Sequence, residues 1–368
     1  MEKRKRSREI DFKYNLNLYW SFLKKYKLLT FGIILVILMT ESIRLVSPFL
    51  FKVIIDNGTE FSAGTLAAGS FIAILIIVAT VFAIKAIFQS ILIWFKLHGI
   101  NTLDVWLMAD IKRKFFNHLI HLDHNFHTTN KTGSLISRLV RSGGAVERLT
   151  DVILFNFAPL ILQVVVVFAS LLYFSLIPAI VIVVTMVLFI GYSFLMQRLQ
   201  EGASIDSINE EDIEKANVAD IFTNIDSIKY FGKENSIKAR FKKLSENSRK
   251  ALLKNWGYYR WMDAVQSLSL STGTFLIVYF SIKQFLAGEI TIGTVSFIYM
   301  VYGTLIGHLF GFVHGIRNYY RAMADFEVLF QYNKIENGIK DKPGAKNLKI
   351  RKGDIEFEDM EFKYGKRK

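Results

Sequence analysis

The sequence has no cysteine among its 368 residues. This absence excludes disulfide bonds, metal sites built on thiolates and cysteine nucleophiles. The segment G-x-x-x-x-G-K-[ST], whose backbone amides hold nucleotide phosphates, is also missing. We therefore do not expect these residues to hydrolyse ATP by themselves.

The composition is at once apolar and basic. Hydrophobic residues make up 52%, the mean hydropathy is +0.30, and the formal net charge is +14. A basic excess can serve nucleic acid, anionic lipid headgroups or membrane topology. Here it is interleaved with long apolar runs, which indicates the cytoplasmic side of a bilayer. Basic residues interleaved with stacking aromatics on a soluble fold are not found, so no nucleic-acid partner is expected.

Several apolar stretches are long enough to cross a membrane, which takes about 20 residues. The stretch at 152–195 is too long for one crossing, and Ser175-Leu176-Ile177-Pro178 is a natural break near its middle. Two crossings joined by a very short turn are therefore predicted there. With this division the sequence predicts six membrane-spanning helices, at about 28–55, 66–97, both halves of 152–195, 264–286 and 292–313.

Lys and Arg are distributed unequally between the two sets of connections. The connection at 56–65 contains Asp56 and Glu60 but no Lys or Arg, and the turn at 175–178 has no charge. The opposite set holds the basic N-terminus and most of the basic residues between 198 and 260. Because basic connections stay in the cytoplasm, both termini are predicted to be cytoplasmic. The first apolar run begins only at residue 28 and has no small-residue cleavage site, so a signal peptide is not expected.

The two long cytoplasmic connections, at about 98–150 and 198–262, have the periodicity of helices. In the first, apolar residues recur at spacings of three and four. Helices that continue for 25 residues beyond the bilayer would reach about 40 Å from it. Such long rods suggest that something large lies below them. The periodic apolar residues are Ile100, Leu103, Leu107, Ile111, Phe115 and Leu119.

The chain changes character after the sixth predicted span. Residues 336–352 form a polar stretch with Asn337-Gly338 and Lys342-Pro343-Gly344, which indicates a linker. Residues 353–364 then show a period-two alternation with a one-residue slip, which predicts a β-strand. A single strand cannot form a domain, so residues 353–368 are expected to begin a domain that has been cut away.

Taken in order, four segments make the chain resemble the ABC exporter family. Each is weak alone, and their order and spacing carry the resemblance over essentially the whole chain. They are 47–58 (SPFLFKVIIDNG), 126–139 (FHTTNKTGSLISRL), 227–234 (SIKYFGKE) and the linker at 343–346 (PGAK) with the predicted strand after it. The segment Lys229-Tyr230-Phe231 and the linker favour the mitochondrial and bacterial exporters of glutathione-linked and heavy-metal compounds.

The resemblance implies an all-α membrane protein whose six long helices extend into the cytoplasm. Residues 1–27 would be a cytoplasmic segment, 28–335 the transmembrane domain, 336–352 the linker and 353–368 the start of a truncated nucleotide-binding domain. ATP and Mg²⁺ would bind to the missing part of that domain, which would carry the Walker A, Walker B and signature motifs. Tyr364 matches the aromatic residue that stacks on adenine.

The family also implies partners and coupling residues. Two half-transporters would form a homodimer or heterodimer, embedded in lipid of the plasma or inner membrane. Short helices at about 123–130 and 220–226 would fit grooves on the nucleotide-binding domains. The residues expected to couple the membrane domain to the ATPase are Asp123, His124, Phe126, Thr128, Thr129, Asp220, Phe222, Asn224 and Asp226.

Charged and histidine residues in the predicted spans are candidates for a substrate cavity. A charge at the middle of a span costs about 2.5–3.5 kcal/mol on insertion scales. Such residues would favour an anionic or amphipathic substrate, although Glu41 and Arg44 alternatively form a structural pair, and Arg317 and Arg321 alternatively bind headgroups. The candidates are Glu41, Arg44, Lys85, His308, His314, Arg317 and Arg321.

Four histidines at 118, 121, 124 and 127 have the spacing of a possible metal ladder. They lie at the predicted coupling turn, where imidazoles more often cap a helix or contact a partner. No metal is therefore expected.

The sequence as a whole predicts the transmembrane subunit of an ATP-driven exporter of hydrophobic, amphipathic, peptide or thiol-conjugate compounds. A secondary transporter is one alternative, although inverted repeats and broken helices are not seen. A non-transporting membrane regulator that keeps the six-helix fold is the other.

Overall fold

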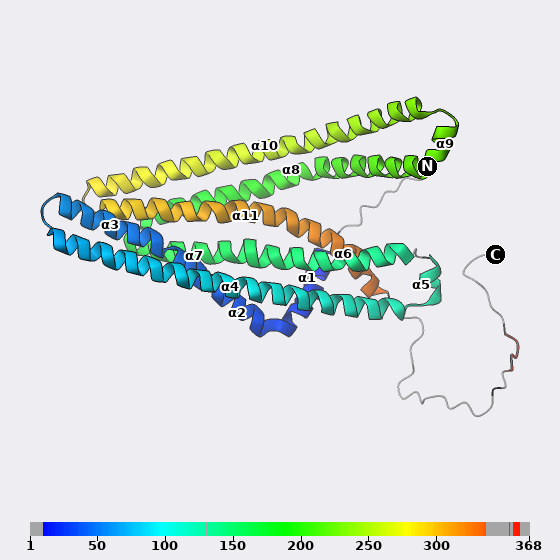
Figure 1. Cartoon of the computed structure of the whole chain (residues 1–368), viewed down its shortest axis with the longest axis horizontal. Coiled ribbons are helices and arrows are strands. Elements are labelled where there is room, and N and C mark those ends of the chain that lie inside the picture. The colour runs from blue at the N-terminus through cyan, green and yellow to red at the C-terminus, as the bar shows by residue number, and fades with distance from the viewer. Residues whose placement is uncertain (1–9, 130–131, 336–352, 354–355, 361–368) are drawn as a thin grey trace. The chain divides into compact units, whose positions relative to one another are not determined.

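The structure is a computed structural model that describes residues 10–129, 132–335, 353 and 356–360 (Figure 1). Within these residues every regular element is a helix, which confirms the predicted all-α class. In chain order the helices are α1 (Phe12–Leu23), η1 (Lys24–Tyr26), α2 (Lys27–Arg44), α3 (Val46–Ser62), α4 (Ala68–Ile120), α5 (His124–Thr129), α6 (Thr132–Asp151), the π-helix η2 (Val152–Phe157), α7 (Ala158–Phe174), α8 (Leu176–Thr223), α9 (Ile225–Tyr230), α10 (Glu234–Leu286), α11 (Ile292–Phe330) and η3 (Gln331–Lys334).

The described residues contain six helical stretches long and apolar enough to cross a membrane. They confirm the six predicted spans. Helices α4 and α10 have 53 residues each, so each is about 80 Å long, against about 30 Å for the bilayer core. The predicted continuation beyond the bilayer follows from these lengths. The stretches are Phe12–Ser62, Ala68–Ile120, Arg138–Phe174, Leu176–Thr223, Glu234–Leu286 and Ile292–Glu327.

The chain divides into two compact units, and each is described by itself. Unit 1 comprises Met1–Ile37, Leu92–Ala158 and His314–Lys368, and unit 2 comprises Leu38–Ile91 and Pro159–Val313.

The core of unit 2 is made by α7, α8, α10 and α11. Leu171, Ile182, Ile277 and Leu305 are among its buried apolar residues. Gly273 on α10 lies at a tight contact, because a Cβ placed there would be 2.6 Å from Tyr302 Oη and 2.7 Å from Thr185 Cγ2. The lack of a side chain at this glycine therefore lets three helices approach one another.

Two interruptions divide the apolar helices of unit 2. The first predicted span bends between α2 and α3, where Leu45 N donates to Ser42 O at 3.1 Å. Pro48, one turn later, has no N–H to donate to the carbonyl of Arg44. The predicted break at Ser175 is confirmed, since this residue is extended (φ −165°, ψ 130°) between α7 and α8.

The start of α11 is held by a carboxylate from α3. Asp56 accepts hydrogen bonds from Gly293 N and Thr291 Oγ1, both at 2.9 Å, and from Lys52 Nζ at 2.7 Å. The first N–H groups of a helix have no partner within it, and a negative charge there is stabilising. Asp56, the first residue of the connection that contains no Lys or Arg, thus also caps a helix.

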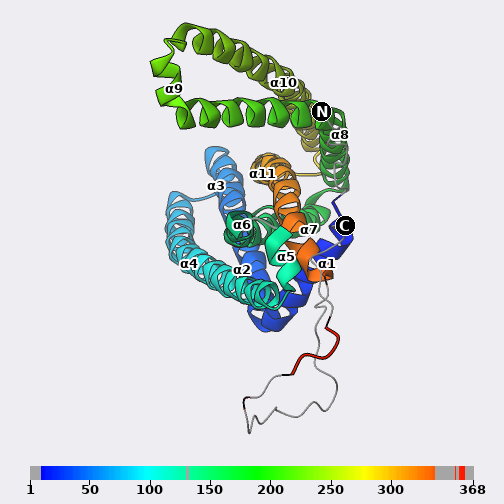
Figure 2. The same cartoon turned by 90° about the vertical axis from the view of Figure 1, so that its right-hand side faces the viewer.

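Helices α8 and α10 form a long hairpin that α9 closes at one end (Figures 1 and 2). Polar pairs tie its two arms together, with Gln266 Nε2 donating to Ser193 Oγ at 2.7 Å and Gln200 Nε2 donating to Asn255 Oδ1 at 2.9 Å. The segment at 198–262 is therefore helical, as its periodicity predicted, apart from the turn at α9.

In unit 1 the N-terminal segment contains a helix that the sequence analysis did not anticipate. Helix α1 buries Asn15, Tyr19 and Leu23, which are spaced four apart on one face. Tyr19 Oη lies 2.8 Å from Thr150 Oγ1, and Asn15 Nδ2 donates to Glu327 Oε2 at 2.8 Å. Polar contacts rather than an apolar run hold α1, so a search for hydrophobic periodicity passed over it.

The strand predicted at 353–364 lies mostly outside the described residues. Its described part, Gly353 and residues 356–360, has no strand conformation. A strand needs a neighbour to receive its hydrogen bonds, and the described part of the chain provides none.

We predict that Gly273→Ala lowers stability by about 1–3 kcal/mol, the usual cost of overpacking a core. Thermal unfolding in detergent, followed by circular dichroism, measures the change. The matched control is Gly303→Ala on α11, where a Cβ would meet nothing within 4 Å. Equal melting temperatures for the two variants would contradict the assigned packing.

Candidate functional site

A cluster of charged and polar side chains lies among the apolar helices of unit 2. It joins Glu41 and Arg44 on α2 to His308 on α11. Arg44 Nε lies 3.2 Å from Glu41 Oε2, and His308 Nε2 lies 3.1 Å from the same oxygen. The side chain of Glu41 is 1% exposed and that of Arg44 is 36% exposed. The ion pair is therefore sealed on its anionic side and open on its cationic side.

His308 Nε2 has two competing neighbours in this cluster. Arg44 Nη1 lies 3.2 Å from it, nearly as close as Glu41 Oε2. A guanidinium only donates and a carboxylate only accepts, whereas one imidazole nitrogen either carries a hydrogen or offers a lone pair. The ring nitrogen can thus bond well to one partner at a time, and its proton decides which.

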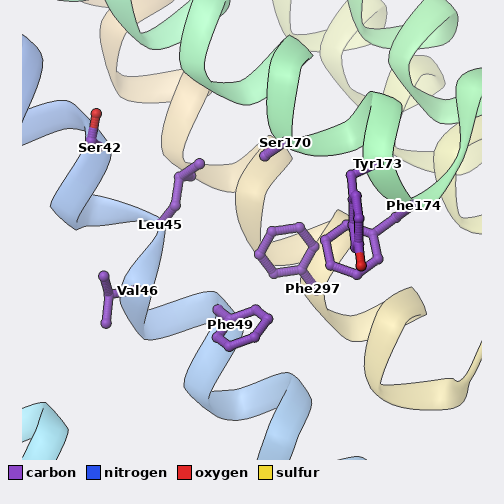
Figure 3. Close-up of a pocket in the computed structure, with 8 residues that line it drawn as sticks. All are labelled: Ser42, Leu45, Val46, Phe49, Ser170, Tyr173, Phe174 and Phe297. Carbon is purple, nitrogen blue, oxygen red and sulfur yellow. The ribbon is translucent and has the colours of Figure 1, made fainter.

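An aromatic-walled pocket of about 360 Å³ opens beside this part of α2. Figure 3 shows the rings of Phe49, Tyr173, Phe174 and Phe297, which come from α3, α7 and α11. Phe297 packs on Phe174 with ring centres 5.0 Å apart. Such walls suit an apolar or aromatic group. The remaining lining residues are Ser42, Leu45, Val46 and Ser170.

The pocket and the cluster share one stretch of helix. Ser42 and Leu45 line the pocket, while Glu41 and Arg44 form the ion pair. Ser42 and Leu45 are three residues apart, and so are Glu41 and Arg44. Each pair therefore lies on one face of the helix, and the two faces are about 100° apart. An apolar surface and a partly exposed guanidinium therefore lie next to each other.

The other predicted cavity residues do not join this cluster in the structure. Lys85 is half-buried on α4, with Nζ 5.7 Å from the ring centre of its neighbour Phe82. His314, Arg317 and Arg321 are exposed on the part of α11 that belongs to unit 1. Of the seven candidates, the structure thus unites Glu41, Arg44 and His308.

The first predicted coupling helix is present as α5. Asp123 precedes it, and its carbonyl accepts from Phe126 N at 2.9 Å. Asp123 and His124 are exposed, and Phe126 is half-buried. Thr128 and Thr129 belong to α5, but their side chains lie outside the described part of the structure.

The second short helix is α9, which begins at Ile225 and not near residue 220 as predicted. Asp220 and Phe222 lie in the last turn of α8, which continues to Thr223 because no residue before Asn224 interrupts it. Asn224 turns the chain, with Nδ2 donating to Asp220 O at 2.9 Å. Asp226 lies in α9 itself. Gly232, with φ of +59°, follows the helix and ends the turn.

Two histidines of the predicted ladder bond to backbone carbonyls. His118 Nε2 lies 2.8 Å from Tyr332 O, and His121 Nδ1 lies 2.7 Å from Asn117 O. Nor do the described residues gather three His, Asp or Glu side chains that could hold a metal ion. Tyr364, the predicted adenine-stacking residue, lies outside the described residues.

Comparison with known proteins decides the family. The model of the ABC transporter transmembrane region matches residues 30–309. The chain belongs to this family. Together with the six apolar helices, the match makes it a multi-pass membrane protein, and it confirms the resemblance drawn from the four sequence segments.

Individual relatives of this ABC transporter chain point to the Atm1-like branch of the family. It is 27% identical over 257 residues to "Iron-sulfur clusters transporter atm1, mitochondrial" of Aspergillus fumigatus, covering 69% of this chain and 35% of that protein. It is 25% identical over 274 residues to "ATP-binding cassette sub-family B member 6" of Mus musculus, covering 69% of this chain and 30% of that protein. The chain thus spans about a third of the length of the curated relatives it matches.

A solved structure shares the fold. The structure of a bacterial Atm1-family ABC exporter with ATP bound superposes with a TM-score of 0.69 at 17% identity. The match covers 88% of this chain and 56% of that one. The long helices of the ABC transporter chain therefore follow an exporter fold.

We predict that Glu41→Leu destabilises the protein, because it leaves Arg44 without its anion. The loss should be below the about 3–5 kcal/mol typical of a fully buried pair, since Arg44 is partly exposed. The double variant Glu41→Leu with Arg44→Leu should recover most of it. Melting temperatures in detergent measure both effects.

The matched control is the exposed pair Glu211–Lys215, whose loss through Glu211→Ala should cost less than about 1 kcal/mol. If the double variant of the buried pair melted no higher than Glu41→Leu alone, the structural pairing would be wrong.

Proposed function

We propose that the chain is the transmembrane subunit of an ATP-driven exporter that works by alternating access. The family match over residues 30–309 carries the proposal. Two features of the fold support it. Several helices are far longer than a bilayer is thick, and a short helix joins α4 to α6 and another joins α8 to α10. Residues 28–335 would form the transmembrane domain and residues 336–352 a linker. The protein would lie in a plasma or inner membrane, with both termini on the cytoplasmic side.

Mechanical coupling would run through the two short helices. Helix α5 joins α4 to α6, and α9 joins α8 to α10. Nucleotide-binding domains, which would hold ATP and Mg²⁺, would dock on α5 and α9, and a second half-transporter would complete the dimer. Because a continuous helix is stiff, a displacement of its cytoplasmic end tilts the whole rod. Such a change is a two-state rigid-body transition.

The substrate would be amphipathic. Its apolar or aromatic part would contact the ring-walled pocket, and its anionic part would lie toward Arg44, whose guanidinium is partly open. Lys85, Arg317 and Arg321 would add positive charge along the path. The segments at 229–231 and 343–346, which resemble those of exporters of glutathione-linked compounds, favour a thiol-linked compound within this class.

Alternating access should appear as an ATP-dependent change in accessibility. Since these 368 residues contain no cysteine, Ser170→Cys adds one label site in the pocket, and the unsubstituted transporter measures any labelling elsewhere. In the full transporter with its ATPase, ATP should change the labelling rate with a membrane-impermeant maleimide by about tenfold, the signature of a shift of about 1.4 kcal/mol.

Thr65→Cys, in the connection after α3, is the control and should label at the same rate with and without ATP. A Ser170→Cys rate that responds to a proton gradient and not to ATP would favour the secondary transporter. A rate that responds to neither would favour the non-transporting regulator.

The pocket should contribute to substrate binding. Tyr173 is 85% exposed, so Tyr173→Ala should not affect folding. We predict that it weakens binding of dinitrophenyl glutathione, an aromatic and anionic thiol conjugate, by about 2–10-fold, as expected for one lost ring contact. Fluorescence quenching in detergent measures the affinity. Tyr299→Ala, an exposed tyrosine of α11 outside the pocket, is the matched control. Equal losses in the two variants would exclude the pocket as the binding site.

A further inference from the structure

Tyr332 lies just beyond α11 and is contacted from three other elements of unit 1. It belongs to η3 and is 7% exposed. From the end of α4, His118 Nε2 lies 2.8 Å from its carbonyl oxygen. From α5, the ring of Phe126 meets its ring edge-on, with centres 5.4 Å apart. From α6, the guanidinium of Arg138 lies 5.3 Å from the centre of its ring and also donates to its hydroxyl.

We infer that Tyr332 is a positioning residue that fastens the coupling helix α5 to the segment leaving α11. The inference rests on the proposed function, since it names a residue through which that transport would be coupled. Displacement of α5 and displacement of the chain after α11 would then be one motion.

The contacts of Tyr332 add something that the neighbouring core does not supply. Phe330 already packs on Phe115 of α4, with ring centres 5.2 Å apart, and on Phe326, with centres 4.6 Å apart. These rings hold α11 to α4. Phe126, in contrast, belongs to α5, so the side chain of Tyr332 connects an element that the buried rings leave out.

The segment around Tyr332 is also held by α1. Asn333 Nδ2 donates to Tyr14 Oη at 2.9 Å, and Lys334 Nζ lies 3.1 Å from Asp11 Oδ2. Upstream, Glu327 Oε2 accepts from Asp11 N at 2.9 Å. With its sequence neighbours bonded to α1 and Asp11 in this way, the segment that carries Tyr332 is held on a further side.

The two kinds of ring contact can be separated by substitution. Tyr332→Phe keeps the ring for Phe126 and for the guanidinium of Arg138, and it removes only the hydroxyl acceptor. Tyr332→Ala removes all of them but leaves the carbonyl that His118 contacts. A graded effect, with the alanine variant well beyond the phenylalanine variant, is therefore expected if the ring provides the connection.

The first measurement is the mobility of a spin label at His127→Cys, an exposed position on α5. Tyr332→Ala should shorten the rotational correlation time of this label by roughly twofold or more, within the nanosecond range that such labels report. Tyr332→Phe should shorten it less. A label at Tyr230→Cys on α9, which belongs to unit 2, should not respond. An unchanged α5 label in Tyr332→Ala would overturn the inference.

The second measurement uses the full transporter with its ATPase. Tyr332→Ala should retain ATP hydrolysis within about twofold, but the ATP-induced change in Ser170→Cys labelling should fall by about fivefold or more, a loss of about 1 kcal/mol of coupling. Tyr299→Ala should keep both. This separates a positioning role from a merely structural one, which would lower hydrolysis and labelling together.

The outcomes distinguish the two proposals. If the unsubstituted transporter shows no ATP-induced change in labelling, the proposed function fails and this inference fails with it. If it shows the change and Tyr332→Ala shows the same change, the inference about Tyr332 is wrong while the proposed function stands.

Discussion

The structure depends on one constraint, which is that the hydrocarbon interior of a bilayer offers no hydrogen-bond partner to a polypeptide backbone. A chain that crosses it must satisfy its own N–H and C=O groups, and an α-helix does so within a single segment. Six such helices follow from the apolar runs of this chain. At Ser175, where the chain breaks between α7 and α8, the backbone N–H still donates to Leu171 O at 2.7 Å, and the hydroxyl donates to Gln284 Oε1 at 2.8 Å.

The same constraint explains why the few charged residues among the apolar helices deserve a functional interpretation. A buried carboxylate is tolerated when a cation and a further donor face it, and Glu41 has Arg44 and His308. Here the guanidinium is partly exposed, next to an aromatic pocket on the adjoining face of α2. The structural pair is therefore compatible with the substrate site that we propose beside it.

The great length of the helices is a second feature of the structure that needs an explanation. Helices that continue far beyond the apolar core gain nothing from the membrane and need other partners. Helix α8 finds one in α10, through polar pairs such as Arg240 Nη2 donating to Asn217 Oδ1 at 2.7 Å. Toward the end of α11, aromatic and charged contacts join apolar packing, and Tyr332 is contacted at its ring from α5 and α6 and at its carbonyl from α4. Stiff rods with a firmly held end are suited to carrying a displacement.

Local patterns in the sequence predicted the spans, the break at Ser175 and the helical extensions, because each depends on hydrophobicity or periodicity within about 20 residues. The short helix α5 was expected from the resemblance to the family and not from these patterns. The start of α9 was placed too early, since a helix end depends on which residue caps it, and Asn224 was read as part of the helix. Helix α1 was missed because polar partners more than a hundred residues away hold it.

Membership of the ABC transporter family was already contained in the sequence, through four short segments in the right order. The sequence also determined which residues carry charge into the apolar helices. Only the tertiary structure decided which of them meet, because His308 lies 267 positions after Glu41. It likewise decided that Asp56 caps α11 and that Tyr332 joins α5 to the end of α11. A periodicity extends along one helix, whereas contacts between helices depend on how the whole chain packs.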